Sequence, residues 1–172
     1  TNTKIKMSNQ FSKLGISDKI IKSLSELKIT EPTEIQEKSI PILLTNTDDF
    51  IGLAKTGTGK TAAFGLPLLQ LIDTKNQNIQ AVILVPTREL GHQIFNNLEV
   101  YAKYLPEVSI AATCGGIPIK PQMERLKTPT QIVVATPGRL IDLIKRNAIN
   151  IKQAQYLILD EADEMITALK EG

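Results

Sequence analysis

The chain has 172 residues, of which 42% are hydrophobic and 22% are charged, and its formal net charge is +2. This length suits one compact domain, since a chain of about 150 residues buries roughly two thirds of its unfolded surface. No apolar run reaches the roughly 18 residues of a membrane-spanning helix, and so small a charge does not by itself indicate a nucleic-acid partner. A single cysteine and a single histidine exclude an internal disulfide and a zinc site of soft ligands. Any metal would therefore need oxygen ligands.

The first ten residues, 1–10, are polar and lack the apolar stretch of a secretory signal, so we expect a flexible segment on a cytoplasmic protein. One domain should follow over residues 11–172. Within it, apolar residues recur at helical spacing over 17–27, where Ser17 is the expected N-cap. A second helix is predicted from Thr33 to about Leu44, because Thr33 and Gln36 have the spacing of a capping box.

Short apolar runs then alternate with longer amphipathic stretches. The runs cover residues 50–53, 81–85, 108–112, 132–135 and 156–159. Runs without polar alternation are typical of strands buried on both faces, and their alternation with helices predicts a mostly parallel sheet covered on each side. We therefore predict a doubly wound α/β domain with five or more strands. In such sheets ligands collect beyond the carboxyl ends of the strands.

A glycine-rich segment, Ala-Lys-Thr-Gly-Thr-Gly-Lys-Thr over 54–61, follows the first predicted strand and precedes a predicted helix. Its glycines let backbone N–H groups turn towards phosphate oxygens, while Lys60 can reach terminal phosphates and the Thr61 hydroxyl can ligate Mg²⁺. The alternative is a glycine-rich turn with an exposed lysine. The predicted phosphate-binding residues are Thr56, Gly57, Thr58, Gly59, Lys60 and Thr61.

Two acidic residues, Asp160 and Glu161, end the last predicted strand. Asp160 can hold Mg²⁺ through water, and Glu161 can orient and deprotonate the water that attacks the terminal phosphorus. The alternative is a solvated acidic loop. Together with the phosphate loop, the acids predict a nucleotide-hydrolysis site whose catalytic residues are Lys60, Asp160 and Glu161.

With Ala162 and Asp163 the acidic segment reads Asp-Glu-Ala-Asp, and here the chain resembles the DEAD-box family of superfamily 2 helicases. Three further segments match family motifs in family order: Pro-Thr-Arg-Glu-Leu at 86–90, Gly-Gly at 115–116 and Thr-Pro-Gly-Arg at 136–139. The resemblance implies a RecA-like P-loop fold, ATP and Mg²⁺ as cofactors, and a role for Asp163 in coupling between domains. It also implies a second RecA-like domain that carries arginine fingers.

In that family the three strand-end segments line the groove for the RNA backbone. Their chemistry suits this role, because the guanidinium groups of Arg88 and Arg139 can bind phosphates. Hydroxyl groups of Thr87 and Thr136 can do the same. The other expected RNA contacts are Pro86, Gly115, Gly116, Pro137 and Gly138. Each segment taken singly could instead be a turn with a helix cap.

The segment Pro-Thr-Glu-Ile-Gln at 32–36 resembles the family's adenine-reading motif, and Phe11 resembles its isolated upstream aromatic residue. The Gln36 amide can donate to N7 of adenine and accept from its exocyclic amine, which favours ATP over GTP. Lys28 and Ile29 stand where the family usually has glycine and an aromatic residue, so we expect an aliphatic contact of Ile29 with the base. Gln36 could cap its helix at the same time, and Phe11 could instead fill the core.

These features predict the ATP-binding half of an ATP-dependent RNA helicase that acts as a monomer and holds RNA by its backbone. An alternative is an ATP-controlled RNA-binding adaptor without unwinding activity. Another kind of P-loop NTPase, such as a small kinase, would leave the three RNA-facing segments unexplained. An arginine finger raises the rate of hydrolysis by a factor of about 10³ to 10⁵. The chain without its second domain should therefore hydrolyse ATP at close to the background rate.

Overall fold

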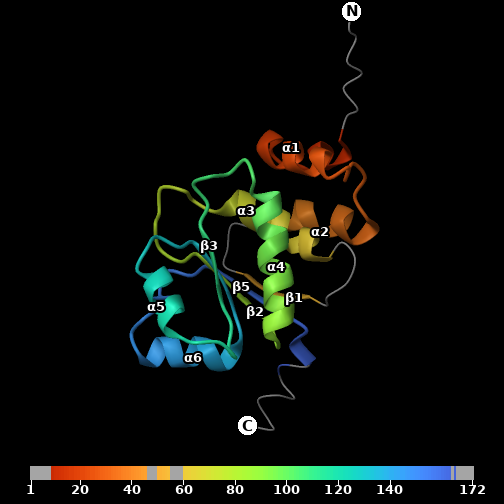
Figure 1. Cartoon of the computed structure of the whole chain (residues 1–172). Coiled ribbons are helices and arrows are strands. Elements are labelled where there is room, and N and C mark those ends of the chain that lie inside the picture. Colours follow the sequence, from red (N-terminus) through yellow and green to blue (C-terminus); the bar gives the residue numbers. More distant parts are fainter. Residues whose placement is uncertain (1–8, 46–49, 55–59, 164, 166–172) are drawn as a thin grey trace, which may run out of the picture.

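Helices and strands alternate along the chain, as the sequence predicts (Figure 1). The computed structural model describes residues 9–45, 50–54, 60–163 and 165. Its elements are η1 (Gln10–Leu14), α1 (Asp18–Glu26), α2 (Glu34–Thr45), β1 (Phe50–Ala54), α3 (Lys60–Leu71), β2 (Ala81–Leu84), α4 (Arg88–Tyr101), β3 (Ile110–Thr113), α5 (Lys120–Leu126), β4 (Ile132–Ala135), α6 (Pro137–Lys145) and β5 (Tyr156–Asp160). Every predicted strand is therefore present, with small displacements of its ends.

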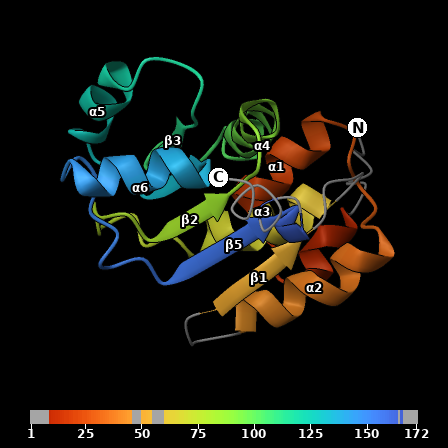
Figure 2. The ribbon, with the colours of Figure 1, turned by 90° about the horizontal axis from the view of Figure 1, so that it is seen from below.

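The strands of the described residues form one parallel, five-stranded sheet in the order β1-β5-β2-β4-β3. Figure 2 shows β1, β5 and β2 side by side and pointing the same way. The last strand in the chain, β5, thus lies between the first two. This arrangement confirms the predicted doubly wound α/β class and makes the ends of β1 and β5 neighbours.

Both faces of the sheet are buried, which explains the continuous apolar runs. One face packs against α3 and α4, and its side chains include Ile83, Val134 and Ile158. The opposite face carries Val82 and Val133, which belong to a second cluster with the end of α5, with α6 and with the segment that follows α6. Side chains of a strand alternate between the two faces, so each run contributes to two separate layers of the core.

The amino-terminal helices attach to this layered core through α3 and α4. α2 packs along α3, and α1 packs against the end of α4, where the Ser23 hydroxyl oxygen lies 2.8 Å from the carbonyl oxygen of Tyr101. Ser17 is the N-cap residue of α1, although its hydroxyl makes no capping hydrogen bond. Among the described residues no helix is long and apolar enough to cross a bilayer.

Of the segment predicted to be flexible, residues 1–8 lie outside the described residues. Asn9 and Gln10, by contrast, are hydrogen bonded to the loop after α1. The Gln10 backbone N–H donates to the Thr30 carbonyl oxygen at 2.9 Å. The folded part of the chain therefore begins at least two residues before the predicted boundary at residue 11.

Two buried glutamines, Gln80 and Gln131, directly precede β2 and β4, and each is 3% exposed. The Gln80 amide accepts from the Asp73 backbone N–H and donates to the carbonyl oxygens of Asp73 and Asn76, each at 2.9 Å. The Gln131 amide accepts from the Ser109 N–H at 2.9 Å. Two buried side chains thus bind backbone groups of the loops that lead into β2 and β3.

Candidate functional site

The carboxyl ends of β1 and β5 bring together residues that lie about a hundred positions apart. In the parallel register Ala54 pairs with Asp160, so the acid ends its strand beside the strand that leads to the glycine-rich segment. Lys60 and Thr61 begin α3, with Lys60 half-buried and Thr61 buried. The predicted phosphate contacts Thr56, Gly57, Thr58 and Gly59 lie outside the described residues.

The two acids at this edge differ in their surroundings. Asp160 is 1% exposed, and Glu161 is half-buried. Glu161 has a φ of 54°, a left-handed backbone conformation that residues other than glycine rarely adopt. Backbone strain of this kind is concentrated at functional sites. Asp163 follows on the next helical turn and is exposed.

Beside this pair, the ends of β2 and β3 are joined through Arg88. Its Nη1 donates to the Gly116 carbonyl oxygen at 3.0 Å. Gly116 has a φ of 84°, a left-handed conformation that favours glycine. A Cβ at that position would lie 3.2 Å from Arg88 Nη1, so the end of the arginine side chain would have to shift slightly. Thr87 caps α4, because its hydroxyl accepts from the Leu90 N–H at 3.2 Å.

The ends of β3 and β4 are joined in the same way. The Gly115 N–H donates to the Thr136 hydroxyl oxygen at 2.8 Å. Thr136 is the N-cap residue of α6 but makes no capping bond there, and Pro137 opens the helix. A Cβ on Gly138 would meet nothing within 4 Å, which leaves open space next to the first turn of α6.

Arg139 is held by two acceptors that no sequence pattern marks. Its Nη1 donates to the Gln122 Oε1 and its Nη2 to the Ile117 carbonyl oxygen, both at 2.7 Å. Gln122 is buried and also donates to the Cys114 carbonyl oxygen at 2.9 Å. Sequence analysis missed Gln122 and Ile117, because neither belongs to a recognised motif and only the packing of α5 beside α6 reveals them.

Cys114 lies beneath these segments and is 2% exposed. Burial raises the pKa of its thiol, and a backbone hydrogen bond from Thr136 and the charge of Arg139 oppose that shift only in part. The neutral thiol is a poor nucleophile. Cys114 is thus a small core residue under the site, not a reactive group within it.

The predicted adenine-reading segment has the capping box that the sequence indicates. The Gln36 Oε1 accepts from the Thr33 N–H at 3.0 Å, and the Thr33 hydroxyl accepts from the Gln36 N–H at 3.4 Å. Gln36 is buried, and Ile29 is partly buried against the core. Gln36 therefore caps its helix, one of the two roles expected for it.

The predicted contact of Phe11 with adenine is wrong in this structure. Phe11 is 0% exposed and belongs to the main hydrophobic core with Ile20, Leu24 and Ile40. A ring without an exposed face cannot stack on a base. Complete burial is favoured because an aromatic side chain removes a large apolar area from water.

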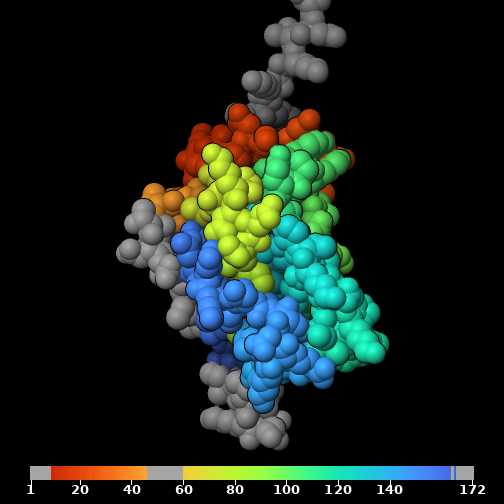
Figure 3. All heavy atoms as spheres, turned by 90° about the vertical axis from the view of Figure 1, so that its left-hand side faces the viewer, coloured from red at the N-terminus to blue at the C-terminus, as the bar shows by residue number. Residues whose placement is uncertain are grey.

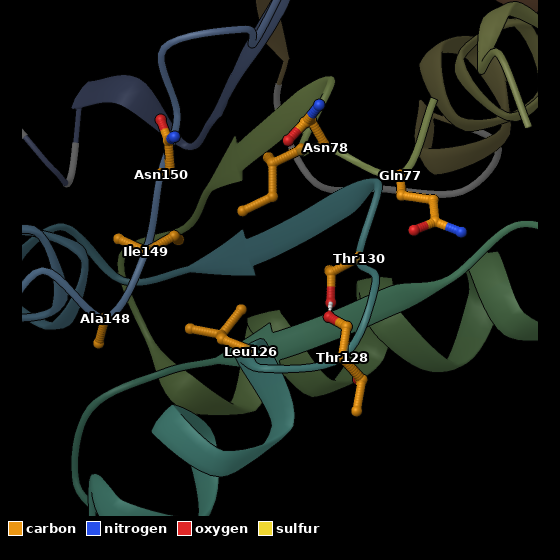
Figure 4. Close-up of a pocket in the computed structure, with 9 residues that line it drawn as sticks. Gln77, Asn78, Leu126, Thr128, Thr130, Ala148, Ile149 and Asn150 are labelled. Carbon is orange, nitrogen blue, oxygen red and sulfur yellow. Dashed lines mark hydrogen bonds between the residues drawn. The ribbon is translucent and has the colours of Figure 1, made fainter. Parts of the chain in front are cut away.

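A separate pocket of about 120 Å³ opens at the amino ends of the strands (Figure 4). It is lined by Gln77, Asn78, Ile79, Leu126, Thr128, Thr130, Ala148, Ile149 and Asn150. The space-filling view shows the loop after α3 beside the segments that follow α5 and α6 (Figure 3). Because the strands are parallel, this pocket lies at the sheet edge opposite Asp160 and Thr136.

The motif spacing and the edge geometry both agree with a known family. A family model described as DEAD/DEAH box helicase matches residues 33–171. The chain belongs to the DEAD/DEAH box helicase family. The resemblance noted from the Asp-Glu-Ala-Asp segment is confirmed, and the chain can be called a DEAD-box chain.

Curated DEAD-box relatives are similar to this chain over most of its length. ATP-dependent RNA helicase CshA of Listeria monocytogenes is 47% identical over 157 residues, which make up 91% of this chain and 30% of that protein. ATP-dependent RNA helicase DeaD of Haemophilus influenzae is 42% identical over 156 residues, which make up 91% of this chain and 25% of that protein. The DEAD-box chain thus spans less than a third of the length of these relatives.

Solved DEAD-box structures have the same fold. A DEAD box protein from the hyperthermophile Methanococcus jannaschii matches with a TM-score of 0.79 and 40% identity, over 92% of this chain and 43% of that one. S. cerevisiae Dbp5 bound to RNA and ADP BeF3 matches with a TM-score of 0.80 and 30% identity, over 92% of this chain and 39% of that one. Both likenesses support the RecA-like assignment of the sheet.

Proposed function

We propose that this chain is the ATP-binding, RecA-like domain of an ATP-dependent RNA helicase. The observation that carries the proposal is the register of β1 and β5, which sets Asp160 beside the strand that leads to Lys60 and Thr61. Ligands of parallel α/β sheets bind at this edge. The activities of CshA and DeaD, and the RNA and nucleotide bound to Dbp5, support the same assignment.

Mg²⁺ and the ATP phosphates would bind at the first turn of α3. The Thr61 hydroxyl and the Asp160 carboxylate provide the oxygen donors that Mg²⁺ prefers. Lys60 would place a positive charge at the terminal phosphates, as would the backbone N–H groups at the helix amino terminus. Bound Mg²⁺ would supply charge neutralisation at the phosphates.

Glu161 would act as the general base that orients and deprotonates the attacking water. The charge that develops on the transferred phosphoryl group needs further cations, which arginine fingers of a second RecA-like domain of the same polypeptide would supply. Asp163, exposed on the turn after Glu161, would couple the two domains. The chain without that domain would therefore bind ATP but hydrolyse it slowly.

RNA would lie along the ends of β2, β3 and β4. Arg88, Thr136 and the glycines of 115–116 are already linked by hydrogen bonds into one continuous edge. Gly138 would allow close approach of the backbone, because the space next to its Cα is open. Pro86, Thr87, Pro137 and Arg139 complete this surface. Contacts with phosphates and sugars would hold any RNA sequence.

Adenine would be recognised by Gln36 and by the aliphatic side chain of Ile29. Gln36 uses its Oε1 to cap α2, which fixes the orientation of the amide. A fixed amide discriminates adenine from guanine by its donor and acceptor pattern. We further propose that residues 11–172, together with Asn9 and Gln10, form one domain that acts as a monomer in the cytoplasm.

The proposal is tested by replacing Lys60. Lys60→Ala should abolish measurable binding of Mg-ATP to the purified chain. It should leave the far-ultraviolet circular dichroism unchanged, since Lys60 belongs to neither hydrophobic core cluster. Lys75→Ala, an exposed lysine before β2 at the opposite edge, is the matched control and should bind ATP normally. Equal affinity of wild type and Lys60→Ala in calorimetry would contradict the site.

A second test separates a helicase from an RNA-binding adaptor. In a protein that also carries the second domain, Glu161→Gln should retain ATP binding and lose RNA-stimulated hydrolysis. Turnover that is undiminished would remove Glu161 from the role of base. A protein with intact Glu161 and no RNA stimulation would favour the adaptor.

A further inference from the structure

Asn9 is a buried polar residue that precedes η1 and belongs to no motif of the sequence. It is 5% exposed, and its Nδ2 donates to the Ile29 carbonyl oxygen at 2.8 Å and to the Ser25 hydroxyl at 3.3 Å. Its Oδ1 accepts from the Phe11 N–H at 3.0 Å and so caps η1. One side chain thus connects the first described residues to the loop that precedes α2.

That loop is held from two directions at Ile29. The Ile29 N–H donates to the Leu24 carbonyl oxygen at 2.9 Å, which ties it to the end of α1. Its carbonyl oxygen accepts from Asn9, and the next carbonyl oxygen, of Thr30, accepts from the Gln10 N–H at 2.9 Å. Residues 30–33 then cross to the capping box without regular secondary structure. The position of Ile29 therefore depends on its hydrogen bonds with Asn9 and with Leu24, neither of which belongs to α2.

We propose that Asn9 is a positioning residue for adenine recognition: by holding the Ile29 carbonyl it fixes the loop that carries Ile29 and leads to the Gln36 segment. The inference rests on the proposed function, because it takes Ile29 and Gln36 as the contacts of the base. A loop that is fixed before binding loses less conformational entropy when the ligand arrives. Asn9 acts only on the base, since the phosphates bind at α3.

The test separates binding of the base from binding of the phosphates. Asn9→Asp keeps the acceptor for the Phe11 N–H but cannot donate to the Ile29 carbonyl. A hydrogen bond of this kind contributes about 0.5–1.5 kcal/mol, so the affinity for Mg-ATP should fall about 2- to 10-fold in calorimetry. The affinity for Mg-tripolyphosphate, which has no base, should stay unchanged.

Two further variants complete the design. Asn9→Ser keeps a capping oxygen, is uncharged and is too short to reach Ile29, so it should repeat the result if the carboxylate of Asn9→Asp prevents folding. Asn78→Asp makes the same amide-to-acid change at an exposed residue near the amino end of β2 and should leave both affinities unchanged.

The outcomes are distinct. An equal loss of affinity for ATP and tripolyphosphate in both Asn9 variants would overturn the inference and make Asn9 a general stabilising residue. Unchanged affinity for ATP in both would also overturn it. If the wild-type chain binds tripolyphosphate but binds GTP at least as tightly as ATP, the proposed adenine site itself is wrong. That result would be independent of the Asn9 variants.

Discussion

The backbone of Lys28 has a φ of 59°, in the left-handed region that favours glycine. The turn at this position ends α1, with the Lys28 N–H donating to the Ser25 carbonyl oxygen at 3.0 Å. The DEAD-box family usually has glycine here, and the structure gives the reason. The hydrogen bonds of the Lys28 N–H with Ser25 and of the Ile29 N–H with Leu24 form a helix-ending turn with a left-handed residue at position 28. Lysine meets the same requirement at the cost of backbone strain.

Lys28→Gly should therefore raise the free energy of unfolding by roughly 0.5–1 kcal/mol, because glycine adopts this φ without the steric penalty. Denaturant unfolding followed by circular dichroism measures the change. Lys19→Gly, within α1, should lower stability instead, because glycine is a poor helix former. A loss of stability in both variants would show that the turn carries no strain.

Gly91 permits close packing of α4 on the sheet. A Cβ at this position would lie 2.5 Å from the Cys114 Sγ and 3.2 Å from the Val85 Cγ2. Both neighbours are buried, so neither can move without disturbing the core beneath the candidate RNA-binding edge. A glycine within a predicted helix is thus explained by a contact between segments far apart in sequence.

Gly91→Ala should lower the free energy of unfolding by about 1–3 kcal/mol through overpacking. In a Cys114→Ala background the loss should be smaller, since the closest atom is absent, and a double-mutant cycle measures the coupling. Gly138→Ala is the control, because its added Cβ would meet nothing within 4 Å and should not destabilise the fold. Equal losses for Gly91→Ala in the two backgrounds would contradict this contact.

At the level of the helices, α1 is fastened to the end of α4 by a charged cluster. Lys103 Nζ lies 2.8 Å from the Glu26 Oε2, and the Tyr104 hydroxyl donates to the other carboxylate oxygen. Lys22 Nζ lies 4.3 Å from the centre of the Tyr104 ring. Since α1 precedes the predicted adenine-reading segment in the chain, this cluster helps to place that segment on the core.

The cluster should depend on pH at both extremes. The hydrogen bonds from Lys103 and then Tyr104 lower the pKa of Glu26, so its contribution is present above the ordinary value of 4.5 and is lost as the pH falls through the lowered pKa. The hydrogen bond to Glu26 raises the pKa of Lys103, so that contribution is present below 10.5 and is lost as the pH rises through the raised pKa. Both groups are exposed, so the effect is small.

Amide chemical shifts of α1, measured by nuclear magnetic resonance from neutral to acid pH, should show the loss of the Glu26 contact. Glu26→Gln should abolish that transition, because the amide does not titrate. Glu34→Gln is the matched control, since the exposed pair of Glu34 with Lys38 lies within α2 and should leave the α1 transition intact. An acid transition of α1 that persists in Glu26→Gln would assign it to another group.

Across the whole domain, the amino edge and the carboxyl edge of the sheet differ in how their loop residues are buried. At the amino ends of the strands, buried amides such as Gln80 bind backbone groups of the adjoining loops, whereas Thr87, Gly116 and Gly138 are exposed at the carboxyl ends, where the proposed ligands would bind. A parallel sheet permits this separation, because all strand ends of one kind lie on the same edge. Stability and ligand binding can therefore be altered independently.

Gln80→Ala should lower the free energy of unfolding by about 1–3 kcal/mol, because it removes three partly buried hydrogen bonds between the Gln80 amide and the backbone of Asp73 and Asn76. The affinity for ATP should not change. Lys60→Ala should show the reverse, with lost affinity and unchanged stability. Thermal unfolding and calorimetry on the same samples measure both quantities, and a fall in ATP affinity for Gln80→Ala would show that the edges are coupled.

Local patterns in the chain were sufficient to predict the strands, the Thr33–Gln36 capping box and the segments that carry the candidate site, because hydrophobic periodicity and turn chemistry act over a few residues. The prediction for Phe11 was wrong because local patterns are all that the sequence offers there. An isolated aromatic residue looks the same in sequence whether it lies in a core or beside a ligand. The neighbours of Arg139 could not be predicted, since Gln122 and Ile117 carry no motif.

The class of fold, the family and the chemical character of the site were already present in the order of short apolar runs and the residues that follow each of them. The insertion of β5 between β1 and β2, the burial of Phe11 and the link from Asn9 to Ile29 came only from long-range packing. Such contacts join distant segments and compete with loop-closure entropy, so no local pattern encodes them. Ala54 and Asp160 become neighbours only when the sheet forms.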